Sequence, residues 1–209
     1  MSTETRELNG FVHRFVPAQS EEPLPTLLLL HGTGGSEESL LSLGRMLLPG
    51  AAVLSPRGKV MEHGMVRFFR RLAEGVFDIP DLLQRTRELA DFVQTASEHY
   101  HFDARNVMAA GYSNGANIAA SMLFLYPHVL ARAILFHPML PLELEQLPDL
   151  TQTPVFIAAG RLDPIVPASN TEQLIEQLQR AGAQVTAQWF NGGHDLSHEE
   201  VREAKAWLK

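Results

Sequence analysis

The sequence predicts an α/β fold with a mostly parallel central sheet that helices cover on both faces. Short apolar stretches alternate with longer amphipathic ones along the chain, as expected of successive βα units. Several apolar stretches, such as 26–30 and 154–159, are continuous runs, which is typical of strands buried on both faces. No repeat, low-complexity tract or linker interrupts the alternation, so we expect residues 1–209 to form one domain.

The expected elements follow the chain in order. A weakly alternating edge strand comes first, and a polar, proline-rich loop over 18–25 follows it. The least regular part is the segment 59–78, for which we expect a loop. We predict strands over 11–16, 26–30, 51–54, 131–136, 154–159 and 185–190 and a strand that starts at 107, with helices over 36–48, 79–100, 114–126, 169–181 and 197–208. The buried side of the second helix is expected to carry Leu82, Leu83, Leu89, Phe92 and Val93.

The composition excludes several classes of function. Of the 209 residues, 45% are hydrophobic and 20% are charged, which suits a globular domain with a sizeable core. The net charge of -7 offers no electrostatic basis for binding nucleic acid or an anionic membrane. The absence of cysteine excludes disulfides, thiolate metal sites and a cysteine nucleophile. The stretch 1–10 does not resemble a signal sequence and the apolar run 27–30 is too short to span a bilayer, so we expect a cytoplasmic protein.

The strongest functional signal is the stretch Gly111-Tyr112-Ser113-Asn114-Gly115. A short apolar strand precedes this Gly-x-Ser-x-Gly pattern and a helix of small residues follows it, as in the nucleophile elbow of α/β hydrolases. Side chains at either glycine would collide across so tight a turn, which holds Ser113 in a strained conformation above the strand ends. A glycine-rich turn with an exposed serine is the alternative for the motif alone. The flanking elements favour an α/β-hydrolase fold, and the short connection 137–153 favours one without a separate lid domain.

Two more polar residues, Asp163 and His194, follow predicted strands and complete the chain order Ser, Asp, His of an α/β-hydrolase triad. The carboxyl ends of parallel strands meet at one edge of the sheet, so these side chains can converge on Ser113. A serine hydroxyl needs a base at neutral pH, and we expect His194 to take its proton while Asp163 orients the imidazole. His137 also follows a strand and is the second choice for the base. Asp195 adjoins His194 in sequence, and neighbouring side chains diverge, so it is a poor candidate for the orienting carboxylate.

Acyl transfer also needs hydrogen-bond donors for the developing oxyanion. The backbone N–H of Asn114 is one candidate, and that of Thr33, in the glycine-rich loop after the strand 26–30, is the other. This loop lacks the glycine patterns of nucleotide-binding loops, so we expect no cofactor. The stretch His198-Glu199-Glu200 has no second histidine at helical spacing, so we expect no metal.

Three residues are candidates for contact with substrate, namely His31, Phe68 and Phe69. His31 directly follows the strand 26–30, and a structural hydrogen bond that holds the oxyanion loop is the alternative role for it. The two phenylalanines lie beside arginines in the segment 59–78, which could form a wall of the active site. Packing of both rings into the core is their alternative.

Several stretches resemble a known family. Leu30-His31-Gly32-Thr33-Gly34-Gly35, the Ser113 motif, Asp163-Pro164 and Gly193-His194 resemble the phospholipase/carboxylesterase family of α/β hydrolases, which includes acyl-protein thioesterases. The stretches 54–58, 67–75 and 156–160 are more similar still to bacterial carboxylesterase-like hydrolases of the methylhydroquinone-inducible type. This resemblance, from about residue 27 to the C-terminus, implies serine esterase or thioesterase chemistry, a cytoplasmic location and the option of a homodimer. Acyl-protein thioesterases carry Gln where this chain has Asn114, and a dienelactone hydrolase would use cysteine, so neither activity is the first expectation.

We therefore expect a carboxylesterase that cleaves small, short-acyl carboxylic esters through an acyl-enzyme intermediate, with no nucleic acid or membrane as partner. Acyl-thioesterase or lysophospholipase activity and the non-catalytic binding of a small ligand are the alternatives. Only 59–78 and 137–153 are available as walls of the site, so its mouth should be open. A shallow pocket of this kind favours acyl chains of about two to six carbons, since each buried methylene contributes about 0.8 kcal/mol.

Overall fold

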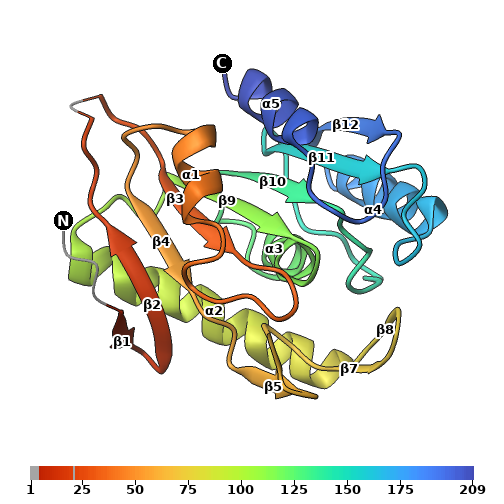
Figure 1. Cartoon of the computed structure of the whole chain (residues 1–209), viewed down its shortest axis with the longest axis horizontal. Helices are drawn as coiled ribbons and strands as arrows, with labels where there is room; N and C mark the ends of the chain where they lie inside the picture. The colour runs from red at the N-terminus through yellow and green to blue at the C-terminus, as the bar shows by residue number, and fades with distance from the viewer. Residues whose placement is uncertain (1–4, 21) are drawn as a thin grey trace.

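A sheet of eight strands forms the centre of the structure, a computed structural model that describes residues 5–20 and 22–209 (Figure 1). The strand order is β1-β2-β4-β3-β9-β10-β11-β12. Neighbouring strands are parallel from β4 to β12 in this order. At the edge formed by β1, the pairs β1–β2 and β2–β4 are antiparallel. The strands of this sheet are β1 (Arg6–Leu8), β2 (Phe11–Val16), β3 (Thr26–Leu30), β4 (Val53–Pro56), β9 (Val107–Tyr112), β10 (Arg132–Phe136), β11 (Pro154–Gly160) and β12 (Gln184–Phe190).

Helices cover both faces of the sheet (Figure 1). Side chains of α2, α3 and α4 pack with those on one face, and side chains of α1 and α5 pack with those on the other. The strand period of two divides β3 between these cores, because Leu28 and Leu30 face one and Leu27 and Leu29 face the other. The helices are α1 (Leu41–Leu47), α2 (Ile79–Tyr100), α3 (Asn114–Leu125), α4 (Ala168–Arg180) and α5 (His198–Trp207).

The ends of the helices follow local chemistry. Asp78 caps α2 by accepting a hydrogen bond from the N–H of Asp81, and Pro80 lies in its first turn. At the other end, His101 adopts a left-handed conformation with φ of 60°. A capping box starts α5, because Ser197 and Glu200 each bond the backbone N–H of the other.

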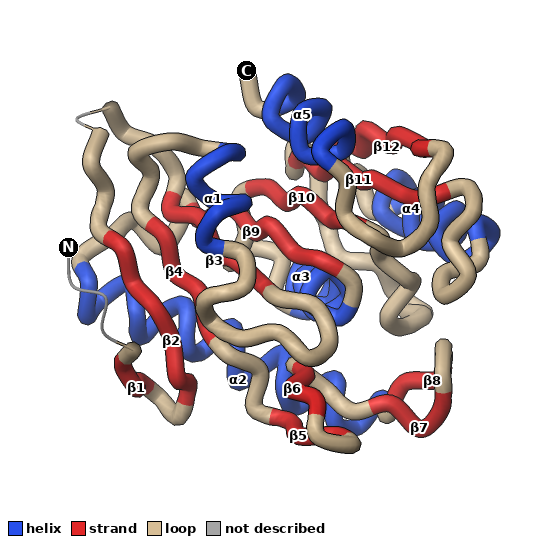
Figure 2. Tube along the Cα trace, viewed as in Figure 1, coloured by secondary structure: helices blue, strands red, loops and turns tan. Residues whose placement is uncertain are grey.

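The segment 59–78 forms two small antiparallel hairpins, which lie beside α2 (Figure 2). Ion pairs connect them to that helix, such as Lys59 with Glu88 and Arg70 with Asp81. This segment is therefore more regular than expected. The hairpin strands are β5 (Val60–Glu62), β6 (Met65–Arg67), β7 (Arg71–Ala73) and β8 (Val76–Phe77).

Most expected elements are present, and the differences have physical reasons. Of the expected helix 36–48, only the second half is helical, and it forms α1. The first half is not helical because the side chain of Glu37 turns inward and pairs with Arg57. The strand β1 was not expected, since it is largely exposed and polar and is defined by its antiparallel pairing with β2 rather than by an apolar pattern of its own. The polar stretch 1–10 and the loop 18–25 each contain residues outside the described ranges, namely 1–4 and 21. Among the described residues, no helix has the length and apolar character needed to cross a membrane.

The predicted mostly parallel sheet with helices on both faces is present, and among the described residues no further domain is inserted between β10 and β11. The expected buried face of α2 is wrong at one position, since Leu83 is 41% exposed whereas Leu82 is fully buried. Successive residues of a helix are rotated by about 100°, so Leu83 lies at the edge of the buried face of α2. The apolar periodicity alone did not show on which side of that edge it falls.

These adjacent leucines provide a matched test of the packing of α2. We expect Leu82→Ala to lower the free energy of unfolding by about 2–5 kcal/mol, because it leaves a cavity in the core. We expect Leu83→Ala to change it by about 0.5 kcal/mol or less, because that side chain is partly in solvent. Urea unfolding of both variants measures the difference, and equal losses would contradict the assignment of the buried face.

Candidate active site

Ser113 lies in the turn between β9 and α3, with φ of 53° and ψ of −116°. A positive φ is uncommon for a residue with a side chain, so the surrounding structure must hold it. The Ser113 N–H donates to the carbonyl of Phe136 at 2.9 Å, and its own carbonyl accepts from the N–H of Asn117 at 2.9 Å. A Cβ on Gly111 would lie 2.5 Å from the carbonyl oxygen of Gly115, so this position excludes any larger residue.

The three side chains predicted as a triad meet at the carboxyl ends of β9, β11 and β12. His194 Nε2 lies 2.8 Å from Ser113 Oγ, and His194 Nδ1 lies 2.7 Å from Asp163 Oδ2. Because a carboxylate only accepts, the Nδ1 atom carries the proton and Nε2 is left as the acceptor for the serine hydroxyl. The arrangement can therefore move a proton from Ser113 to His194.

The side chain of Asp163 is buried, and both of its carboxylate oxygens accept hydrogen bonds. Its Oδ1 accepts from the N–H groups of Ile165 and Val166 at 2.8 and 3.0 Å. Burial acts to raise the pKa of Asp163, but the hydrogen bonds from His194 and from these two N–H groups outweigh it and lower the pKa overall. The carboxylate is therefore ionised at neutral pH, as an orienting group for the imidazole must be.

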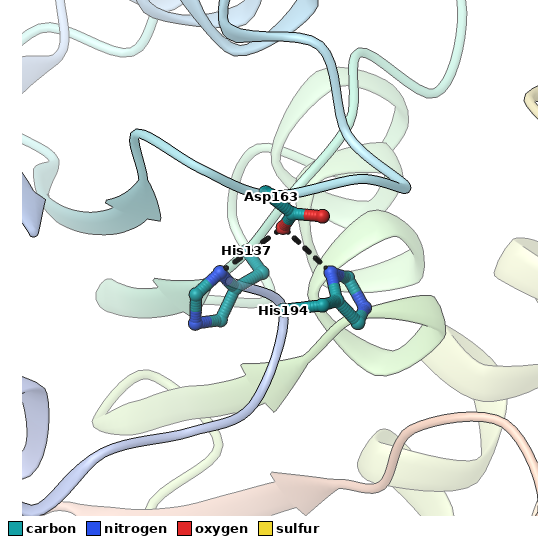
Figure 3. A group of neighbouring side chains, drawn as sticks. All are labelled: His137, Asp163 and His194. Carbon is teal, nitrogen blue, oxygen red and sulfur yellow. Dashed lines mark hydrogen bonds and ion pairs between the residues drawn. The ribbon is translucent and has the colours of Figure 1, made fainter. Parts of the chain in front are cut away.

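A second imidazole, that of His137, lies on the other side of Asp163 (Figure 3). Its Nδ1 is 3.3 Å from Asp163 Oδ2, but it is His194 that contacts Ser113. His137, the second choice for the base, therefore contacts the orienting carboxylate of Asp163 and not the hydroxyl of Ser113.

His137, Asp163 and His194 offer ligand atoms within 4.8 Å of one another, as a metal site would. However, the 2.7 Å between His194 Nδ1 and Asp163 Oδ2 is a hydrogen-bond distance. Ligand atoms of a tetrahedral zinc are separated by about 3.4 Å, given metal–ligand bonds of about 2.0–2.2 Å. The group therefore fits a chain of shared protons better than a metal centre.

The loop after β3 lines the cavity that contains Ser113. Thr33 and Asn114 line the same cavity as Ser113, and among the described residues no acceptor is bonded to the backbone N–H of either. The β5–β6 hairpin holds the loop, since Arg67 Nη1 donates to Thr33 Oγ1 at 2.6 Å and the N–H of Gly34 donates to the carbonyl of Val66 at 2.8 Å. Two backbone N–H groups without an acceptor in the described part of the chain thus line the cavity of Ser113, that of Thr33 on the supported loop and that of Asn114 at the start of α3.

The structure corrects the role of His31. The ring is 1% exposed, and its Nδ1 lies 2.7 Å from the carbonyl of Gly32, while Nε2 lies 3.0 Å from the N–H of Gly58. Burial lowers the pKa of His31, so the ring is neutral and holds the loop rather than contacting substrate. Such a structural hydrogen bond was the alternative role for this residue.

Phe68 and Phe69 are also corrected, because their rings pack in the core at 2% and 0% exposure. The Phe68 ring lies 4.6 Å from that of His31, tilted by 34°, and the Phe68 N–H donates to Asn114 Oδ1 at 2.7 Å. Phe69 meets Phe77 edge to face, with ring centroids 5.1 Å apart. Burying each apolar ring in the core is more favourable than exposing it in a solvent-filled cavity. Both phenylalanines therefore support the site through packing and do not line it.

A cavity of about 290 Å³ opens beside Ser113. The hairpins of 59–78 do form one of its walls, but with residues other than the two phenylalanines. Met65 and Ile165 at its rim are 38% and 40% exposed, so the mouth is open. Its apolar lining comprises Met65, Phe77, Met139 and Ile165, and its polar lining includes Thr33, Arg67, Arg71, Glu74 and Asn117.

Tyr112 is a site residue that sequence reasoning missed. Its hydroxyl donates to the backbone carbonyl of His194 at 2.9 Å, and its ring lies 5.6 Å from that imidazole. Burial, together with the nearby carboxylates led by Asp195, raises the pKa of Tyr112 to about 12, so the hydroxyl keeps its proton. Its position directly before Ser113 was the only sequence signal.

We expect Tyr112→Phe to lower kcat about tenfold with little change in KM, because the loop that carries His194 loses its tether. Steady-state kinetics on a p-nitrophenyl ester measures this, with Tyr126→Phe at the far end of α3 as the control. A wild-type kcat for Tyr112→Phe would show that the hydrogen bond does not position the base.

The parallel sheet and the elbow between β9 and α3 define the class of this protein as an α/β hydrolase. Residues 71–206 match the Dienelactone hydrolase family, and the chain belongs to that family and is a hydrolase. The chain has no cysteine, so it lacks the cysteine nucleophile expected of a dienelactone hydrolase.

The relatives confirm the expected kinship with bacterial carboxylesterase-like hydrolases. MhqD of Bacillus subtilis, named as a hydrolase, is 53% identical over 183 residues, which cover 88% of this chain and 92% of that protein. The carboxylesterase of Bacillus cereus superposes with a TM-score of 0.92 at 51% identity, over 94% of this chain and 92% of that one. YahD, solved with malic acid, superposes with a TM-score of 0.90 at 34% identity, over 95% and 98% of the two chains.

Proposed function

We propose that the protein is a serine carboxylesterase that cleaves small, short-acyl esters through Ser113, His194 and Asp163. The observation that carries this proposal is the continuous contact from Ser113 Oγ through His194 to Asp163, at 2.8 and 2.7 Å. A ligand-binding protein has no use for a base aligned on a strained serine. Kinship with one protein named a carboxylesterase and with another named a hydrolase supports the same chemistry.

In the first half of the reaction, His194 Nε2 takes the proton of the Ser113 hydroxyl as Oγ bonds the ester carbonyl carbon. The tetrahedral oxyanion collapses, the bond to the alkoxy oxygen breaks, and His194 returns the proton to the leaving alcohol. In the second half, water attacks the acyl-enzyme by the same route and releases the acid. Asp163 stabilises the imidazolium during both halves.

The backbone N–H groups of Thr33 and Asn114 are the donors for the oxyanion. Both lie beside Ser113 without another acceptor among the described residues, and Asn114 begins α3, so the dipole of that helix adds to its donor strength. Losing one such donor typically costs about 3 kcal/mol of transition-state stabilisation. Arg67 keeps the loop of Thr33 at this position.

We expect a fluorophosphonate to label the protein once and Ser113→Ala to abolish both the label and the esterase activity, since among the described residues Ser113 is the only serine whose hydroxyl is hydrogen-bonded to an imidazole. Mass spectrometry counts the label, and hydrolysis of p-nitrophenyl acetate measures the activity. Ser121→Ala, which alters another buried serine, on α3, is the control and should label normally. Persistent labelling of Ser113→Ala would refute the assignment.

We expect kcat/KM for p-nitrophenyl esters to peak at acyl chains of about two to six carbons, because a cavity of about 290 Å³ buries few methylenes. Methylenes beyond its open mouth remain in water and add no binding energy. The measurement is kcat/KM against acyl length. A steady rise through long chains would instead favour a lysophospholipase or long-chain acyl-thioesterase, and a parallel series of acyl-thioesters separates oxygen esters from thioesters.

A further inference from the structure

Two buried ionisable groups take no part in the chemistry described above. His137 and Glu200 have side chains that are 0% and 3% exposed, and they continue the series of contacts beyond Asp163. His137 Nδ1 is 3.3 Å from Asp163 Oδ2, and its Nε2 is 3.0 Å from Glu200 Oε1. These are ion-pair contacts rather than well-aligned hydrogen bonds. Burying three ionisable groups in contact is costly, so their role needs an explanation.

The backbone holds both groups firmly. His137 follows β10 with φ of 51°, a left-handed conformation that is unfavourable for a residue with a side chain, and its N–H donates to the carbonyl of Ala158 at 2.8 Å. Glu200 belongs to the capping box of α5, where its Oε2 accepts from the N–H and the hydroxyl of Ser197 at 2.6 and 2.8 Å. The box leaves Oε1 free to face His137.

The charges of the group follow from the donors around it. Burial acts to raise the pKa of Glu200, but the contact with His137 and the two bonds from Ser197 outweigh it and lower the pKa. Asp163 is lowered as well, so both carboxylates are ionised at neutral pH. An imidazole between two carboxylates makes an attractive contact with both only when each ring nitrogen carries a proton. The rings of Tyr112 and His194 are the other titratable groups that face His137.

We propose that Glu200 and His137 are positioning residues that extend the triad into a buried chain, in which an imidazolium at His137 keeps Asp163 ionised and aimed at His194. This inference rests on the proposed function, since it concerns the carboxylate that orients the base. Asp163 Oδ2 is shared between the two imidazoles, so the positive charge of His137 offsets part of the negative charge that His194 experiences. Glu200 in turn supplies a counter-charge to that imidazolium from the side of Nε2.

The test is the pH profile of His137→Gln on p-nitrophenyl acetate. The variant removes a positive charge beside Asp163, so the base should hold its proton more tightly and the acid limb of kcat/KM should move to higher pH. We expect kcat at the plateau to fall about tenfold with KM nearly unchanged. His13→Gln is the matched control, because His13 is another fully buried histidine, bonded to Tyr100 far from the site. His13→Gln loses packing but no charge beside Asp163, so the acid limb of its pH profile should stay where it is in the wild type.

A double-mutant cycle tests whether Glu200 acts through His137. Glu200→Gln should lower kcat in the wild-type background but add little in the His137→Gln background. If His137→Gln does not fold, Glu200→Gln still decides, because its kcat should fall further than that of Ser197→Ala, which weakens the same cap but keeps the carboxylate. An acid limb in His137→Gln equal to that of His13→Gln, or fully additive effects, would overturn the inference. The proposed function fails on a different result, namely esterase activity in Ser113→Ala.

Discussion

The close approach of α3 to β3 is the constraint on which the rest of the site depends. A Cβ on Gly115 would collide with the carbonyl groups of Leu30 and His31, so only glycine lets the helix begin at this distance. That contact places Ser113 at the top of β9 and, at the same time, fixes the start of the loop that carries Thr33. One backbone contact therefore sets the spacing between the nucleophile and the oxyanion donors.

Around this contact, segments far apart in sequence hold the reacting groups in place. The hairpins of 59–78 reach the oxyanion loop through Arg67 and reach the start of α3 through the N–H of Phe68. On the other side, Asp163 accepts bonds from its own loop and contacts two imidazoles. The proposed catalytic groups are thus preorganised by neighbours that need not touch substrate, which reduces the reorganisation needed during the reaction.

Features that depend on local chemistry could be predicted from the amino-acid sequence. The periodicity of apolar residues predicted the α/β alternation, and the bounds of α2 agree with the structure because Asp78 and Pro80 start that helix locally. The spacing of glycines around Ser113 predicted the elbow, since the steric demand of the turn acts within five consecutive residues. The order of Ser113, Asp163 and His194 predicted three side chains that the structure brings into contact.

Which side chains face the cavity and which support it depends on long-range packing, so local sequence patterns could not predict it. His137 and His194 both follow strands, but the order of β10, β11 and β12 places Asp163 between them, so only His194 contacts Ser113. Phe68, Phe69 and His31 turn inward because burial and long-range hydrogen bonds decide their orientation, and no local pattern encodes either. The same holds for Glu200, whose capping role is readable in Ser197-x-x-Glu200 but whose contact with His137 exists only once α5 packs against the sheet.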